Sequence, residues 1–363
     1  MKNKIPQIIF VLAVLAFIGT ILFVWQSPTL KNYSMGNDEY FFYRITMNLP
    51  HYATTGEWFI EENAPNKEAL QDSEYITGTA YNTKVWIHPL LDNYLAYPIA
   101  KLFSDVANQI QWLRLFCVFI IIITFLLFVD IIRKKSNYYV AAIAIFPMIV
   151  GRLLLANGIM FYYDLFQWLF FALTLWIIER NPNSKWIYIF AAITVLSKFY
   201  SILFLIPIWF YLDYKQSKIK KQVTVMSITL VLIFFMLQAI LAHDILYQYH
   251  HWIALSGTSS GNLINNVLPN FWGYVYTWGL WLTLPLIFFG SYKIIRKKME
   301  DYYVFASFGL IVLICSLAWG FYPYHVFPIM YAAMFMIPAL VYKKGVADEN
   351  KIIPNYISSK QKM

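Results

Sequence analysis

The chain has 363 residues, of which 60% are hydrophobic, 20% are aromatic and only 13% are charged. A typical soluble domain carries about a quarter charged residues, so this composition excludes an ordinary soluble enzyme. It also excludes a disordered chain, because disordered segments combine low hydrophobicity with high net charge. The remaining class is a polytopic membrane protein in which lipid surrounds most of the surface.

The apolar runs, taken in chain order, predict an all-α fold with about ten membrane segments. The first run follows Lys2 and Lys4 and has roughly 20 residues, more than the core of a signal peptide, so we expect an uncleaved signal anchor. The runs are 5–25, 112–132, 138–155, 165–178, 186–212, 222–242, 271–294, 302–319 and 326–342.

The run 186–212 has basic residues at both ends, and the positive-inside rule places both groups in the cytoplasm. One crossing would separate them, so we expect a break at Ser197-Lys198 that turns the run into a pair of short segments. Each limb then has about 13 residues, fewer than the ~20 needed to span a bilayer, so at least one limb is tilted or re-entrant.

The same rule predicts that both termini are cytoplasmic and that the protein lies in the cell (inner or cytoplasmic) membrane among membrane lipids. Twenty of the 28 Lys and Arg residues then fall on the cytoplasmic side. The net charge of +9 is therefore explained by topology, and nucleic acid is not an expected partner.

We expect one transmembrane domain over residues 1–344 and a short cytoplasmic tail over 345–363. Two long loops lie on the outer side, 27–111 and 243–270, and the first carries ten acidic residues. Within it, the stretch 85–103 is moderately apolar but interrupted by Pro89, Asp92 and Pro98. This pattern favours interfacial helices that lie on the membrane rather than a span.

Asp38 and Glu39 open the first outer loop within the stretch Gly-Asn-Asp-Glu-Tyr-Phe-Phe-Tyr-Arg. Adjacent carboxylates do not share one helix face, which indicates separate tasks. One could take a proton from an attacking hydroxyl while the other orients that hydroxyl or a sugar. The alternative is a helix N-cap, with both charges favoured by the helix dipole.

Four other polar residues stand at the predicted outer boundary. His88 precedes a proline and could contact a phosphate or an acceptor, or simply cap a helix. Asp164 is a carboxylate where the chain re-enters the membrane, and it needs a polar cavity or a partner such as Arg152. Lys198, at the tip of the short pair, suits a lipid-linked phosphate, although snorkelling to the interface would also explain it.

The sequence does not support a metal site. Cys117 and Cys315 both lie in apolar runs, and the adjacent His250 and His251 diverge without a third ligand at helical spacing. No cofactor is therefore expected.

Several of these stretches, in this order, resemble the GT-C superfamily of polytopic glycosyltransferases, nearest to the branch with protein O-mannosyltransferases and lipid A aminoarabinose transferases. The matching elements are Asp38-Glu39-Tyr40, Gly56-Glu57-Trp58, His88-Pro89-Leu90-Leu91, Asp164, Leu196-Ser197-Lys198 and Tyr322-Pro323-Tyr324-His325. The family often has an Arg before the last element, and this chain lacks it. The resemblance covers the chain from Ile5 to Lys344.

The resemblance implies inverting transfer of a sugar from a polyprenyl-phosphate donor to a glycan, lipid or protein acceptor on the periplasmic or exterior face. It implies that Asp38 is the general base and that Glu39 assists it. Donor phosphate would bind to Lys198, Arg152 and His325. Substrate would contact His88, Asp164 and Tyr324.

Two other classes stay open at this stage. A transporter or flippase of lipid-linked sugars would have charges near the middle of spans and repeated halves, and the sequence shows no repeat. An O-antigen polymerase or ligase would usually have its main outer loop late in the chain, whereas here it follows the first helix.

Overall fold

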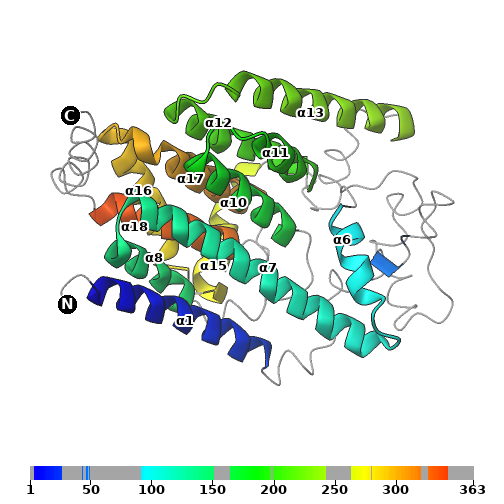
Figure 1. Ribbon diagram of the computed structural model, residues 1–363, viewed down its shortest axis with the longest axis horizontal. Helices are drawn as coiled ribbons and strands as arrows, with labels where there is room; N and C mark the ends of the chain where they lie inside the picture. Colours follow the sequence, from blue (N-terminus) through cyan, green and yellow to red (C-terminus); the bar gives the residue numbers. More distant parts are fainter. Residues whose placement is uncertain are drawn as a thin grey trace, which may run out of the picture.

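The computed structural model describes residues 4–26, 43, 46–47, 49, 91–150, 164–197, 199–242, 263–278, 280–319 and 326–341. All regular structure within these ranges is helical, as the composition predicts. Most of the long helices run side by side along the longest axis of the molecule (Figure 1). Three of the described helices are long and apolar enough to cross a membrane: Ile5–Trp25, Ala107–Lys135 and Glu300–Leu317.

The helices of the first half follow the predicted runs. They are α1 (Ile5–Trp25), α6 (Leu91–Ala100), α7 (Val106–Lys135), α8 (Tyr138–Val150) and α10 (Asp164–Arg180). The short helix α6 confirms that the stretch 85–103 is partly helical, as predicted. Helix α1 lies at the edge of the bundle beside α7 and α8 (Figure 1). Its Phe17 stacks on Phe125 of α7, with 3.8 Å between the ring centroids.

The second half contains the remaining helices. They are α11 (Trp186–Ser197), the 3₁₀ helix η1 (Phe199–Phe204), α12 (Leu205–Tyr214), α13 (Lys220–Ala242), α15 (Leu263–Trp278), α16 (Thr283–Arg296), η2 (Glu300–Tyr302), α17 (Tyr303–Trp319) and α18 (Val326–Val341). The predicted break at Ser197-Lys198 is present, since α11 ends at Ser197.

The run 271–294 was predicted as one segment and is instead divided between α15 and α16. Helix α15 begins at Leu263, inside the predicted second outer loop 243–270. The amide of Leu280 then donates to the carbonyl of Tyr274 at 3.2 Å. This hydrogen bond joins residues six apart in the chain, whereas a bond within an α-helix joins residues four apart. Apolar composition alone did not reveal this, because the residues on both sides of the break are apolar.

The core is a cluster of aromatic rings contributed by α7, α10, η1, α17 and α18. Phe128 packs edge-on against Phe335 at 4.8 Å, and Phe171 stacks on Phe308 at 5.1 Å. Phe204 of η1 closes the cluster against Phe171 at 5.2 Å. Because lipid gives little hydrophobic driving force between helices, such van der Waals and ring contacts hold the bundle together.

Close packing of α16 on α18 depends on glycine. A Cβ added at Gly290 would lie 2.5 Å from the Cβ of Met336, closer than real Cβ atoms approach. Gly290 therefore lets two helix backbones come together, as small residues do at membrane helix interfaces.

Basic residues gather at one end of the bundle, which we call the basic end. Asp130 of α7 accepts hydrogen bonds from Arg133 and Arg180, both at 2.6 Å, and from the indole of Trp176 at 3.0 Å. Beside it, Glu179 pairs with Lys215 at 2.9 Å, and Lys135 Nζ lies 3.9 Å away. These contacts bring the ends of α7, α10 and α12 to the same level.

Candidate functional site

Most of the residues predicted to form the site lie outside the described residues. They are Asp38, Glu39, His88, Arg152, Lys198, Tyr324 and His325. Asp164 is the first residue of α10. The described helices end next to these residues in sequence, and several of them bury polar groups near those ends.

The described helix ends next to these residues lie at the end of the bundle opposite the basic end, which we call the loop end. Helices α7 and α10 run parallel, since Phe116 contacts Phe166 near their starts at 5.6 Å while Asp130 binds Arg180 near their ends. Trp168 of α10 packs on Phe204 of η1 at 4.9 Å, which brings η1 beside α10. The adjoining positions are Leu91 for His88, Val150 for Arg152, Ser197 and Phe199 for Lys198, and Val326 for His325.

Two described residues of the predicted first outer loop, Tyr43 and Thr46, bond to α7 and α6. Tyr43, five residues after Asp38, is buried and its hydroxyl donates to Gln109 Oε1. Thr46 is fully buried, and its Oγ1 accepts a hydrogen bond of 2.8 Å from Asn93 Nδ2. Buried polar groups of this kind fix register, because each would lose its partner if the segment shifted. Tyr43 and Thr46 are thus held against the bundle.

The start of α7 is fixed by its own cap. Asp105 Oδ1 accepts from the amide of Asn108 at 2.8 Å, and Asp105 Oδ2 accepts from Asn108 Nδ2 at 2.6 Å. These hydrogen bonds lower the pKa of the Asp105 carboxyl below its usual value, so the cap stays charged at neutral pH. Gln109 Nε2 donates to the carbonyl of Phe103 at 2.7 Å and ties the α6–α7 turn to the same point.

Arg114 is the largest charged side chain buried in the described part of the chain, with 1% of its surface exposed. It lies two turns into α7 from the loop end. Seven residues further along the same helix face, the carbonyl of Ile121 accepts a hydrogen bond from Tyr331 of α18 at 3.4 Å. A buried arginine in an apolar helix is costly and marks a substrate pathway or an internal partner.

Unpartnered polar groups lie in α10 and η1 near the loop end. Gln167 is fully buried, and neither amide atom has a hydrogen-bond partner among the described residues. The same holds for the indole Nε1 of Trp168 and the hydroxyl of Ser201. Unsatisfied buried polar groups cost free energy. Their presence one turn from the aromatic core therefore indicates that they bind a polar group of a ligand.

Sequence reasoning missed Arg114, Gln167 and Ser201. Each is a polar residue inside an otherwise apolar run, and this signal was available without the structure. What the sequence did not indicate is which of the polar residues in those runs face the bundle interior, because that depends on how the helices are rotated against each other.

Within the described ranges, no three His, Cys, Asp or Glu side chains gather. Cys117 and Cys315 are free and buried. His250 and His251 lie outside the described residues.

Residues 87–240 match a family model described as dolichyl-phosphate-mannose-protein mannosyltransferase. This segment begins at Ile87, includes His88, and extends through α6, α7, α8, α10, α11 and α12 into α13. The match supports a membrane glycosyltransferase of the GT-C superfamily, as the motifs predict. No curated protein and no solved structure shows significant similarity to the chain.

Proposed function

We propose that the protein is an inverting glycosyltransferase that moves one sugar from a polyprenyl-phosphate donor to an acceptor on the outer face of the cell membrane. The acceptor class is a cell-envelope glycan, a lipid or a protein. Both termini lie in the cytoplasm in this proposal, so the loop end faces the periplasm or exterior.

The observation that carries the proposal is the position of the buried polar residues. Arg114, Gln167 and Ser201 lie in the interior near the loop end, where the helices adjoin the predicted site residues. A lipid-linked donor needs polar partners at this depth, because its sugar phosphate stays beside the membrane while its chain remains in lipid. The family match over 87–240 supports the same chemistry.

Asp38 acts as the general base in this proposal. Its carboxylate takes the proton of the acceptor hydroxyl as the oxygen attacks the anomeric carbon. The bond from that carbon to the phosphate oxygen breaks, and polyprenyl phosphate leaves with the electron pair. Glu39, Asp164, His88 and Tyr324 shape and polarise the acceptor pocket. Docking of Tyr43 and Thr46 holds the segment that follows the base.

Positive charge is required where the leaving phosphate develops negative charge. Lys198, Arg152 and His325 supply it in this proposal. The chain lacks the arginine that the family often has near the last motif, and in this proposal Arg114 takes over its role. A guanidinium cannot lose its proton and binds phosphate through two N–H groups at once, so it suits a buried site.

The test is complementation of cells that lack the protein, with mass spectrometry of their envelope glycans. We expect loss of the protein to remove one sugar from a glycan, lipid or protein species, and the wild-type chain to restore it. Asp38→Asn keeps the shape of the side chain but removes its basicity, so the rate should fall by about 10²–10⁴-fold. Glu39→Gln is the matched control, and its rate of transfer should fall less.

Restoration of the glycan by Asp38→Asn at wild-type rate would contradict the assignment of the base. An envelope whose glycans do not change when the protein is removed would contradict the proposed transfer itself.

A further inference from the structure

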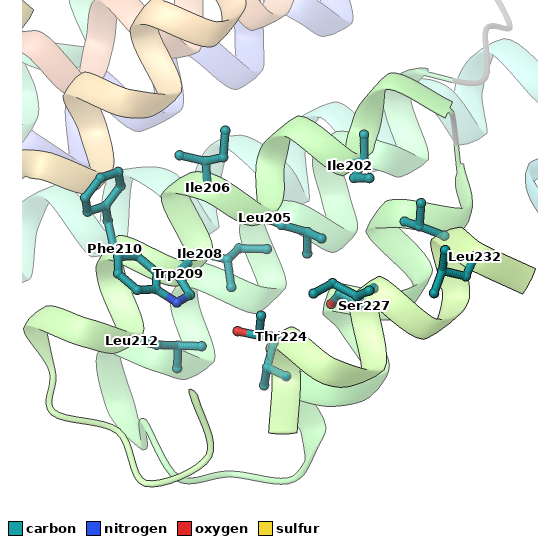
Figure 2. Close-up of a pocket in the computed structure, with 13 residues that line it drawn as sticks. Ile202, Leu205, Ile206, Ile208, Trp209, Phe210, Leu212, Thr224, Ser227 and Leu232 are labelled. Carbon is teal, nitrogen blue, oxygen red and sulfur yellow. The ribbon is translucent and has the colours of Figure 1, made fainter. Parts of the chain in front are cut away.

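A groove of about 410 Å³ lies between α12 and α13 (Figure 2). Its volume is within the range of ligand sites, and its walls are almost wholly apolar. The figure shows side chains of α12 facing those of α13 across it. They include Leu205, Ile208, Trp209, Thr224, Ser227 and Leu232.

The groove opens on the outer surface of the helix bundle. Helix α13 packs on α11 and α12 at the edge of the molecule (Figure 1). Several lining residues are exposed, most strongly Leu232 at 57% and Ile228 at 53%, and Ile206, Trp209 and Phe210 are exposed as well. A flexible apolar chain could therefore enter from the bilayer.

The groove reaches the basic end of the bundle at a lysine-rich turn. Lys220 and Lys221 stand one turn before Thr224 on the α13 surface that lines the groove. Lys220 Nζ lies 4.3 Å from the centroid of Trp209 and pairs with Asp213. The contact with Trp209 fixes a positive charge directly at the wall of the groove.

This turn has an excess of positive charge. Lys215 is neutralised by Glu179 and Lys220 by Asp213. Lys218 and Lys221 are exposed, and within the described residues neither forms an ion pair. Two cations thus remain beside the mouth of an apolar groove.

Ser227 provides an independent sign of a ligand. Its side chain is fully buried in the groove wall, and its hydroxyl has no hydrogen-bond partner among the described residues. The neighbouring Thr224 and Thr229 donate to the carbonyls four residues earlier, both at 2.9 Å. Ser227 lies seven residues from Lys220, or about 10 Å along the helix axis.

We propose that this groove binds one anionic phospholipid. The head-group phosphate lies at Lys218 and Lys221 beside Lys220, an acyl chain fills the groove, and the Ser227 hydroxyl donates to an acyl ester carbonyl. Basic pockets between membrane helices are typical sites for anionic head groups. The proposal is independent of the proposed glycosyl transfer.

The charged mouth of the groove argues against the sugar donor as its occupant. Lys218 and Lys221 lie at the basic end, whereas the residues predicted to bind donor phosphate adjoin the loop end. One phosphate cannot be at both ends of the bundle.

The experiment is native mass spectrometry of the full-length protein with phosphatidylglycerol or phosphatidylcholine of identical acyl chains. We expect the wild type to retain one molecule of phosphatidylglycerol in preference to phosphatidylcholine. Lys218→Gln with Lys221→Gln should weaken that retention by roughly fivefold per lysine. Ser227→Phe fills the groove and should reduce binding of both lipids.

The matched control is Arg296→Gln with Lys297→Gln, which removes two exposed cations from the same end of the bundle but away from the groove. This pair should retain phosphatidylglycerol as the wild type does. Equal retention of the two lipids by the wild type would overturn the proposal. A competition experiment gives a second such outcome. The proposal would also be overturned if polyprenyl phosphate displaced phosphatidylglycerol from the wild type and from the Lys218→Gln, Lys221→Gln variant to the same extent.

Discussion

The backbone amide of Lys218 donates a hydrogen bond of 2.8 Å to Asn183 Oδ1, across 35 residues of the chain. The hydroxyl of Ser217 reinforces it by donating to the carbonyl of Pro182. The two contacts join the start of α11 to the end of α12. The chain therefore leaves the basic end through α11 and returns to it through η1 and α12, as the basic residues at both ends of this run predict.

This pairing leads to a prediction about topology. A cysteine at Ser73 or Ser259, in the predicted outer loops, should react in intact cells with a membrane-impermeant thiol reagent. A cysteine at Ser136 or Lys221, at the basic end, should react only after the cells are opened. The native Cys117 and Cys315 are buried and should give little background.

Labelling of Lys221→Cys from outside intact cells would contradict the predicted orientation. If the reagent labels the Ser136→Cys variant but not the Lys221→Cys variant in intact cells, the two positions lie on opposite sides of the membrane. That result would contradict the return of α12 to the basic end.

A second prediction concerns the ion network at the basic end. The Glu179 side chain is 11% exposed and pairs with Lys215, and it also accepts from the Tyr211 hydroxyl. Glu179→Gln leaves Lys215 without its ion-pair partner and removes the carboxylate 3.9 Å from the nearly buried Lys135, so the free energy of unfolding should fall by about 3–5 kcal/mol. Thermal unfolding of the purified protein in detergent would measure this.

Asp213→Asn is the control for that measurement. Its carboxylate also pairs with a lysine, Lys220, but its side chain is 54% exposed. Solvent screens such a pair, and its loss should cost less than about 1 kcal/mol. Equal losses of stability in Glu179→Gln and Asp213→Asn would show that burial does not strengthen the ion pair of Glu179.

A third prediction concerns the contact between α16 and α18. Gly290→Ala would place a Cβ 2.5 Å from Met336 Cβ, so the helices must separate and stability should fall by about 1–3 kcal/mol. A Cβ at Gly309 would meet the end of the Met336 side chain, Cε, at 2.9 Å, Ile287 Cγ2 at 3.1 Å and Ser291 Oγ at 3.5 Å. Because the end of a side chain can shift more readily than a Cβ, Gly309→Ala should lower stability less than Gly290→Ala does.

Met336→Ala separates the two cases, because it removes Cε but keeps Cβ. In double-mutant cycles it should relieve the clash of Gly309→Ala and leave that of Gly290→Ala largely in place. Relief of both clashes to the same extent would show that the helix backbones are not in close contact at Gly290.

A fourth prediction tests the donor site of the proposed function. Lys198→Ala should raise the concentration of lipid-linked donor needed for half-maximal transfer, because it removes a cation from the donor phosphate. Lys185→Ala is the matched control, since this exposed lysine lies at the other end of α11. If Lys198→Ala uses the donor as the wild type does, Lys198 only anchors the short pair at the interface.

The sequence by itself determined the class of the protein, the course of most helices and the turn between α11 and α12. Apolar runs of this length must be helical in lipid, since only a helix satisfies all backbone groups within one segment. Basic clusters on both sides of 186–212 were likewise sufficient to predict the return, because positive charge at segment ends follows one side of the membrane. The order of the acidic, His-Pro and Lys motifs also predicted the superfamily that the match at 87–240 supports.

Only the tertiary structure decided which polar residues inside those runs are buried and which elements share a groove. Arg114 and Gln167 occur in sequence among apolar neighbours, and helical periodicity is uninformative when nearly every position is apolar. The division of 271–294 into α15 and α16 was hidden for the same reason. The rotation of each helix is set by ring packing and close contacts such as Phe171–Phe308 and Gly290–Met336, which join residues far apart in the chain.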